Sequence, residues 1–156
     1  MNVRALTECR VRCAQSSEAA AIAAIHRELF DRPWEVDGLR RLLELTNVRA
    51  FVAEAGLAQL AGFILGRVAA DEAEILSVGV ATAWQRRGLG GQLAGELAAT
   101  LVRSGVQRLF LEVAADNAPA LALYFRQGFR SVARRKGYYE RRDEPAADAL
   151  VLAKTL

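Results

Sequence analysis

A glycine-rich turn near the middle of the chain has the residue types of an anion-binding site. The turn is made of Gln85, Arg86, Arg87, Gly88, Leu89, Gly90 and Gly91. Before it, the apolar run 75–80 predicts a strand that is buried on both faces. After it, leucines recur every four residues from Leu89 to Leu101 and predict a helix that Gly105 ends. Free backbone N–H groups and the positive end of the helix dipole meet at such a junction, so we expect the turn to hold a phosphate.

Two other phosphate-binding turns fit the sequence less well. A P-loop has a lysine followed by Ser or Thr after its last glycine, whereas Gln92 follows here. A Rossmann turn matches Gly88 and Gly90, and Glu112 lies near the distance expected of its ribose-binding carboxylate. Leu93, however, occupies the third glycine position. A dinucleotide site is therefore disfavoured without being excluded, and a turn that merely connects two elements is the third alternative.

Glu112 and Tyr124 have side chains that could transfer protons. Glu112 lies within the apolar run 109–113, which predicts a second central strand. Tyr124 lies on a helix predicted from 118 to 127, with Asn117 as its N-cap. The carboxylate could be a general base, and it could equally be a structural group that pairs with an arginine. A tyrosine on a mostly apolar helix face is usually part of the core, so the residues alone leave both roles open.

These segments, taken together, resemble the GCN5-related N-acetyltransferases (GNAT family). Residues 85–90 match the Gln/Arg-x-x-Gly-x-Gly/Ala signature of that family. The similarity continues in order through residues 111–113, Asn117, 120–124, 128–129 and 138–139. This series resembles the RimI-type branch, the ribosomal-protein-alanine N-acetyltransferases. It covers about half of the chain closely and the N-terminal third loosely.

The resemblance implies that acetyl-CoA is the acetyl donor. In the family the glycine-rich turn binds the pyrophosphate of acetyl-CoA, and backbone N–H groups should matter more there than the side chains of Arg86 and Arg87. Val78 and Val80 would present the backbone donor for an oxyanion, and Asn117 would add a polar contact to the cofactor arm. Gly79 is unusual inside a strand and indicates a bulge or the close approach of a ligand.

The resemblance also implies roles on the acceptor side. Glu112 would be the general base, acting through water, and Tyr124 would be the acid that protonates the leaving thiolate. The acceptor would lie against Trp34, Glu112, Tyr138 and Tyr139. The family tends to have Asn-Tyr-Tyr and Pro-Trp-Ser where this chain has Gly137 before its tyrosines and Glu35 after its tryptophan. These departures concern the identity of the acceptor, not the type of reaction.

The order of predicted elements is β-α-α-β-β-β-α-β-α-β-β. The strands are expected at 9–13, 50–54, 60–68, 75–80, 109–113, 129–134 and 147–152, and the four helices near 16–30, 36–43, 89–103 and 118–127. We expect one α/β domain over residues 1–156, with a mixed central sheet of about seven strands. The unit 75–113 predicts a right-handed crossover between two parallel strands. The resemblance implies that these strands splay, and parallel strands place a site at their carboxyl ends.

The composition is that of a folded chain, because 53% of the residues are hydrophobic. No apolar run approaches the ~18 residues that a membrane span needs. Residues 1–8 lack the apolar segment of a signal peptide, so we expect a cytoplasmic protein with no membrane partner. Cys9 and Cys13 lie about 13 Å apart on the first strand, too far for a disulfide. We expect both to face the core beside Val11, while Arg10 and Arg12 face solvent.

Charge and ligand types exclude further classes. The net charge is +3, and direct nucleic-acid binding is not expected. No metal site is expected either, because the chain has one histidine and two cysteines on a strand. The histidine, His26, is predicted on a helix surface, and a role in binding the substrate is the alternative. One basic cluster could be a solvated face, could steer an anionic cofactor, or could dock on a ribosomal particle. The cluster is made of Arg126, Arg130, Arg134, Arg135, Lys136, Arg141 and Arg142, interrupted only by Glu140.

The resulting hypothesis is an acetyl-CoA-dependent N-acetyltransferase that acts on a protein N-terminal α-amine. The best guess for the acceptor is the N-terminal alanine of a small-subunit ribosomal protein. An acetyltransferase for a small-molecule amine is one alternative. A non-catalytic acyl-CoA-binding regulatory module is another, and in it Glu112 and Tyr124 would be core residues only.

Overall fold

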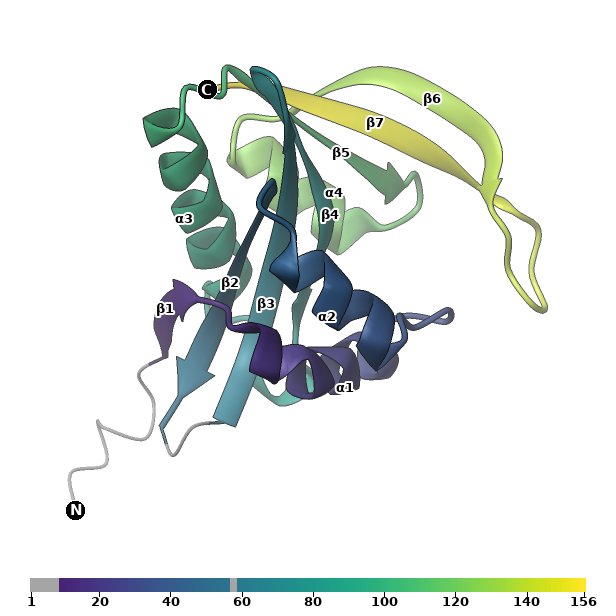
Figure 1. Ribbon diagram of the computed structural model, residues 1–156. Helices are drawn as coiled ribbons and strands as arrows, with labels where there is room; N and C mark the ends of the chain where they lie inside the picture. Colours follow the sequence, from purple (N-terminus) through teal and green to yellow (C-terminus); the bar gives the residue numbers. More distant parts are fainter. Residues whose placement is uncertain (1–8, 57–58) are drawn as a thin grey trace.

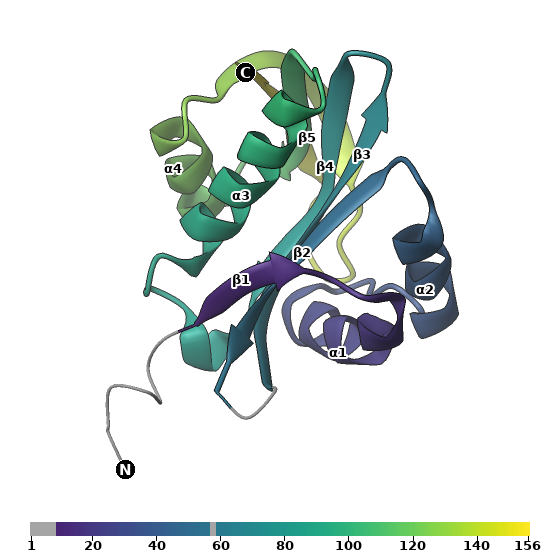
Figure 2. The same cartoon turned by 60° about the vertical axis from the view of Figure 1, so that its left-hand side comes forward.

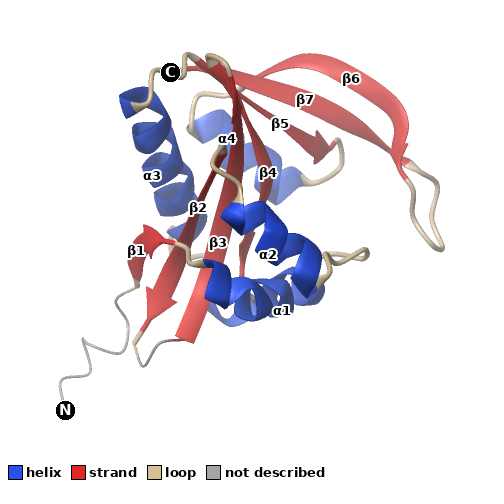
Figure 3. Ribbon diagram, in the orientation of Figure 1, coloured by secondary structure: helices blue, strands red, loops and turns tan. Residues whose placement is uncertain are grey.

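Seven strands form one mixed sheet in the computed structural model, which describes residues 9–56 and 59–156 (Figures 1 and 3). The order across the sheet is β1-β2-β3-β4-β5-β7-β6, and only β4 and β5 run parallel. The strands are β1 (Arg10–Cys13), β2 (Val48–Ala55), β3 (Gln59–Ala69), β4 (Glu72–Val80), β5 (Arg108–Ala114), β6 (Arg130–Tyr139) and β7 (Ala147–Thr155). The predicted sheet is confirmed, although β6 continues five residues past its predicted end at 134.

Two pairs of helices cover opposite faces of the sheet (Figure 2). Helices α1 (Ala19–Leu29) and α2 (Val36–Glu44) lie on one face, and α3 (Leu89–Arg103) and α4 (Ala118–Arg126) lie on the other. Each pair closes its own apolar core. One core contains Ile22, Leu39 and Phe63, and the other contains Leu93, Leu97 and Leu111. The leucine repeat of α3 therefore points at the sheet, as its spacing predicted.

The parallel strands β4 and β5 separate soon after they begin. Their register pairs Glu72 with Arg108, Ala73 with Leu109 and Glu74 with Phe110. Beyond these three pairs, β4 continues to Val80 and β5 to Ala114 without pairing to each other. The strand ends that carry the predicted site therefore form the two sides of a wedge, which is the predicted splay.

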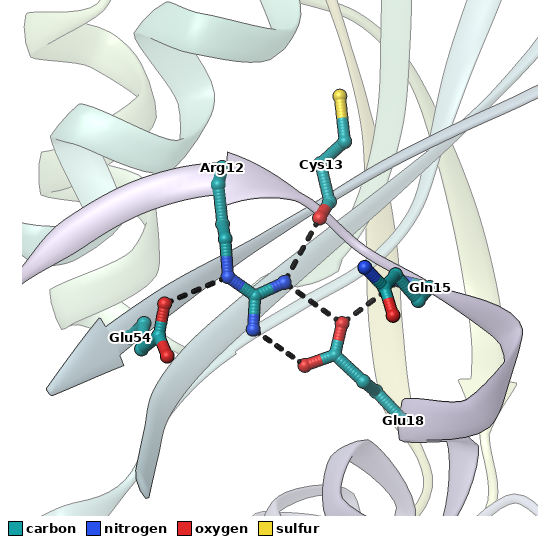
Figure 4. Close-up of polar contacts among 5 residues, drawn as sticks. All are labelled: Arg12, Cys13, Gln15, Glu18 and Glu54. Carbon is teal, nitrogen blue, oxygen red and sulfur yellow. Dashed lines mark hydrogen bonds and ion pairs between the residues drawn. The ribbon is translucent and has the colours of Figure 1, made fainter. Parts of the chain in front are cut away.

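The first strand differs from its prediction. Cys9 is partly buried against the α3 core, but Cys13 is exposed, so its predicted place in the core is wrong. Arg12 was expected to face solvent, yet its guanidinium bonds to Glu18 at 2.7 Å and 2.9 Å and to Glu54 at 2.8 Å (Figure 4). These hydrogen bonds lower the pKa of the Glu18 carboxyl. β1 is an edge strand and pairs only with β2. The hydrogen bonds of Arg12 additionally attach it to Glu54 of β2 and to Glu18, which directly precedes α1.

His26 also lies elsewhere than predicted. Its side chain is buried in the last turn of α1, where 3% of the residue is exposed, so the predicted position on the helix surface is wrong. The apolar stripe of α1 is wider than Ile22, Ile25 and Leu29 alone indicate, because the segment that follows the helix folds back over its last turn. A short 3-10 helix, Ser16–Glu18, precedes α1, and the backbone N–H of its N-cap residue Gln15 donates to the Glu18 carboxylate at 2.8 Å.

Candidate active site

The end of β4 forms one side of the wedge. Val78 and Val80 are partly buried against the core under α3. Gly79 points to the opposite face, where a Cβ would lie 2.8 Å from Leu29 Cδ1 and 2.9 Å from Phe63 Cε1. The glycine is therefore required by the close packing of α1 and β3. Of the two alternatives predicted for Gly79, a bulge or the close approach of a ligand, the bulge lies instead near Leu76, where the register shifts opposite Leu65 and Gly66.

The glycine-rich turn connects β4 to α3 through a short 3-10 helix, Thr82–Trp84. Arg86 and Gly88 both have positive φ, 64° and 81°. The N–H of Gln92 bonds to the carbonyl of Gly88 at 3.1 Å and closes the first helical turn. The N–H groups of Leu89, Gly90 and Gly91 lie before that bond, at the positive end of the helix dipole. The turn thus has the backbone of an anion-binding concavity.

The glycines of this turn serve different purposes. A Cβ at Gly88 would meet no neighbour within 4 Å, so the positive φ is what favours glycine there. A Cβ at Gly90 would lie 3.2 Å from Leu123, and a Cβ at Gly91 would lie 3.3 Å from Gln127 Nε2. Gly90 and Gly91 therefore allow the start of α3 to approach α4.

Two side chains hold the turn against its neighbours. Gln85 Nε2 donates to the carbonyl of Val80 at 3.0 Å, so this predicted site residue fastens the turn to β4. From α1, the Glu28 carboxylate accepts a hydrogen bond from the N–H of Thr82 at 2.8 Å. The guanidinium of Arg87 lies 4.8 Å from the ring centre of Trp84. Glu28 could not be found from the sequence, because nothing near it in the chain indicates the contact.

Glu112 lies on the other side of the wedge. Leu109, Leu111 and Val113 point into the core of α3 and α4, so Glu112 faces the opposite side of the sheet. Its side chain is 21% exposed and forms an ion pair with Arg135 at 3.3 Å. The alternative that Glu112 pairs with an arginine is therefore realised in the structure. A role as base is compatible with this pair, because a carboxylate has further acceptor positions.

Tyr124 projects from α4 into the core at the wedge. The residue is 5% exposed, and its ring makes an edge contact with Phe129 at 5.6 Å. Burial raises the pKa of Tyr124 to about 12, with a smaller contribution from Tyr139. The hydroxyl therefore keeps its proton at neutral pH. Asn117 caps the helix as predicted, since its Oδ1 accepts the N–H of Ala120 at 3.3 Å.

Two consecutive tyrosines, Tyr138 and Tyr139, lie at the end of β6. Burial raises the pKa of Tyr139, and the negative charge of Glu112 raises it further. Arg135 lies 5.1 Å from the ring centre of Tyr138. Tyr139 therefore lies near both Glu112 and Tyr124, and we call these three residues, which are linked through Tyr139, the Glu112 cluster. Sequence reasoning placed Arg135 in the basic cluster without its partner.

Trp34 is separate from the Glu112 cluster. Its ring packs in the core of α1 and α2, and its backbone N–H donates to His26 Nδ1 at 3.2 Å. The segment before it does reach the residues that follow β6, because Arg32 forms an ion pair with Glu140 at 3.1 Å. This contact joins the α1–α2 connection to the loop after β6.

Three of the seven residues of the basic cluster form ion pairs. Arg134 pairs with Asp148 at 2.6 Å, and Arg141 bonds to both carboxylate oxygens of Asp116 at 2.5 Å and 2.6 Å. Arg135 pairs with Glu112. Arg134 and Arg135 remain 53% and 54% exposed despite these pairs, so a solvated face, cofactor steering and docking on a partner all stay open.

Neither a metal site nor a membrane span is found in the part of the chain that the structure describes. No group of three His, Cys, Asp or Glu side chains is placed there to hold a metal ion. No described helix combines the length and apolar character that crossing a bilayer requires.

Comparison with known proteins adds a family and several relatives. Residues 19–129 match the sequence model of the acetyltransferase (GNAT) family. A [ribosomal protein bS18]-alanine N-acetyltransferase of Escherichia coli (strain K12) is 39% identical over 95 residues, which are 61% of this chain. The chain spans 64% of the length of that relative. The N-alpha-acetyltransferase RimI of Mycobacterium tuberculosis is 38% identical over 128 residues, which cover 79% of each chain.

The overall structure is similar to that of solved acetyltransferases. The crystal structure of the ribosomal-protein-S18-alanine N-acetyltransferase from Escherichia coli superposes with a TM-score of 0.88. It is 28% identical, and the superposition covers 95% of this chain and 94% of that one. The similarity includes nearly the whole of both chains, so the two proteins share their overall fold.

Proposed function

This chain belongs to the acetyltransferase (GNAT) family, and on that premise we propose that it transfers the acetyl group of acetyl-CoA to a protein N-terminal α-amine. The observation that carries the proposal is the wedge. β4 and β5 part after three residue pairs, and the Glu112 cluster lies where they are apart. An extended cofactor arm and an acceptor amine could meet there from opposite faces of the sheet.

The residues present fit acetyl-CoA. Backbone N–H groups of Leu89, Gly90 and Gly91 at the start of α3 would hold the pyrophosphate, supported by the positive φ of Arg86 and Gly88. Val78, Gly79 and Val80 would border the thioester arm, since their strand has no partner on the β5 side. Asn117 would contribute a polar contact near the start of α4. When bound, acetyl-CoA supplies an acetyl group activated as a thioester.

The protein's own groups would manage the protons. Glu112 would accept the proton of the acceptor ammonium, directly or through one water molecule, so that the amine becomes a nucleophile. Tyr124 keeps its proton at neutral pH and would donate it to the leaving sulfur. Backbone N–H groups on the free edge of β4 would stabilise the negative charge that develops on the carbonyl oxygen. Tyr138 and Tyr139 would line the acceptor side, with Trp34 acting from a distance.

The acceptor is proposed from the relatives. The similar proteins of Escherichia coli and Mycobacterium tuberculosis are named for N-terminal acetylation, the former of alanine on ribosomal protein bS18. We infer the same class of acceptor here, the N-terminal alanine of a small-subunit ribosomal protein in the cytoplasm. Glu35 and Gly137 stand where the RimI-type pattern has serine and asparagine, so the sequence preference after the first alanine is a separate question.

Mass spectrometry of a competition assay tests this proposal. The protein is incubated with acetyl-CoA, a peptide with the N-terminus of the organism's own bS18, the same peptide with a blocked N-terminus, and a panel of polyamines and aminoglycosides. A gain of 42 Da, the mass of one acetyl group, is expected on the free peptide only. Faster acetylation of a small amine would favour the small-molecule enzyme. Binding of acetyl-CoA without transfer to any acceptor would favour the regulatory module.

A further inference from the structure

The single histidine of the chain is enclosed by aromatic rings. The His26 ring stacks on Phe30 with centres 4.3 Å apart and planes at 24°. On Trp34 it stacks at 4.8 Å and 21°. Phe63 of β3 closes a third side at 6.1 Å. Phe30 and Trp34 are near the two ends of the α1–α2 connection, residues 30–35, so the imidazole holds both ends of that segment against α1.

A hydrogen bond fixes which nitrogen of the imidazole carries the proton. The backbone N–H of Trp34 donates to His26 Nδ1 at 3.2 Å. Nδ1 must therefore be the unprotonated nitrogen, and the neutral ring carries its proton on Nε2. Burial favours this neutral form and lowers the pKa of His26. The contact is directional, and a ring of the same size without an acceptor nitrogen would not replace it.

The segment 30–35 has a second attachment of a weaker kind. Arg32 pairs with Glu140, and the two side chains are 79% and 75% exposed. Ion pairs so exposed to solvent add little stability. The buried contacts of His26 therefore dominate the position of the segment, and the ion pair shows that the segment lies next to the loop that follows Tyr138 and Tyr139.

We propose that His26 is a positioning residue for the acceptor, which acts by holding the segment 30–35 through the backbone of Trp34 and the stacked rings. The proposal rests on the proposed function only in assigning the segment to the acceptor side. Loss of the Nδ1 acceptor loosens the segment and its contact with the β6–β7 loop, while β4, the glycine-rich turn and Glu112 remain in place. His26 thereby affects capture of the acceptor and not the binding of acetyl-CoA.

Two variants separate this role from a general contribution to stability. His26→Phe keeps a ring between Phe30 and Trp34 but removes the acceptor atom. We expect the Trp34 amide to exchange with solvent about tenfold faster, the effect of losing one hydrogen bond. The KM for the peptide acceptor should rise about as much, with kcat and the KM for acetyl-CoA close to those of the wild type. Ile22→Val, a buried change on the same helix, should lower Tm and leave both KM values unchanged.

The outcomes are distinguishable from failure of the proposed function. If no N-terminal peptide is acetylated by the wild type, the proposed function is wrong, and exchange of the Trp34 amide still tests the hold on the segment. Fast exchange with an unchanged acceptor KM would leave His26 a structural residue only. Unchanged exchange would show that the hydrogen bond does not hold the segment. His26→Asn, whose Oδ1 lies near the place of Nδ1, should keep the amide protected and serves if His26→Phe does not fold.

Discussion

Glu112 forms an ion pair and also lies near the hydroxyl group of Tyr139. Its carboxylate lies 3.3 Å from the guanidinium of Arg135, and its negative charge raises the pKa of Tyr139. A structural ion pair and a general base are usually treated as alternatives. Here the guanidinium comes from the side of β6, so an acceptor could approach the carboxylate from the wedge. Replacing the carboxylate distinguishes the two roles, because loss of a general base lowers turnover whereas loss of an ion pair lowers stability.

Glu112→Gln should lower turnover about 10²–10⁴-fold, because the amide cannot accept a proton. Affinity for acetyl-CoA should hardly change. The measurement is kcat with a verified acceptor, together with acetyl-CoA binding by calorimetry. Asp148→Asn is the matched control, since Asp148 also pairs with a β6 arginine, Arg134, at 2.6 Å. Loss of stability with retained turnover in Glu112→Gln, like that expected for Asp148→Asn, would remove Glu112 from the mechanism.

Tyr124→Phe should lower kcat much more than it weakens acetyl-CoA binding. The phenyl ring preserves the edge contact with Phe129, and only the proton that the buried hydroxyl holds is lost. Single-turnover kinetics at several pH values provide the measurement. Tyr138→Phe, which removes a hydroxyl from a half-exposed tyrosine outside the Glu112 cluster, is the control. A normal rate of the chemical step would return Tyr124 to a purely structural role.

Helix α1 contains His26, whose titration should make the stability of the protein depend on pH in the neutral range. Because burial lowers the pKa of His26, the unfolded chain binds a proton that the folded chain does not. Unfolding free energy should therefore fall as pH decreases through about 6.5, the ordinary pKa of histidine. Urea unfolding at pH 7.5 and 5.5 should show this loss in the wild type and not in His26→Phe. Equal losses in both proteins would contradict it.

Carboxylates do not obscure that comparison. Hydrogen bonds from arginines lower the pKa of Glu18 and Asp116, and a hydrogen bond from the Gly137 N–H is the main cause for Asp148. Their contribution to stability is present above the ordinary carboxyl pKa of about 4 and is lost only below it. The window between pH 5.5 and 7.5 therefore reports the histidine.

The start of α3 is the element on which the proposed binding of acetyl-CoA would depend. Gly88→Val should abolish the rise in Tm that acetyl-CoA produces, because a β-branched residue is strained at a φ of 81° and the turn must rearrange. Gly95→Ala is the matched control on the same helix, since Gly95 is exposed and a Cβ there meets nothing within 4 Å. It should stabilise the protein by about 0.5–1 kcal/mol and leave the acetyl-CoA shift intact. A full shift in Gly88→Val would place the phosphates elsewhere.

At the scale of the whole molecule, the wedge divides the sheet into two parts. β1 to β4 and β5 to β7 share three residue pairs of the central ladder, and otherwise helices connect them. A ligand that fills the wedge should therefore tie the two parts together. We expect acetyl-CoA at 100 times its Kd to stabilise the folded state by about 2.7 kcal/mol through mass action. Thermal unfolding with acetyl-CoA and with NAD compares the two ligands, and a larger shift with NAD would favour the Rossmann alternative.

The sequence by itself determined the features that depend on neighbours along the chain. Helix α3 runs over Leu89–Arg103 as the leucine spacing and Gly105 predicted, and Asn117 caps α4. The strand–turn–helix unit around Gly88 was likewise apparent. In each case the stabilising interactions join residues a few positions apart, so the local sequence pattern is sufficient to predict the structure.

Only the tertiary structure decided the contacts between distant segments. Arg135 reaches Glu112 because β7 lies between β5 and β6, with Val151 opposite Glu112 and Ala149 opposite Arg135. His26 is buried because residues 30–35 fold back over it. Position 79 requires glycine because Leu29 and Phe63 leave no room for a Cβ. Cys13 is exposed because β1 is an edge strand and the residue lies at its end. The order of the strands in the sheet, and which residues other segments bury, depend on how all the elements pack together. A local sequence pattern therefore cannot predict them.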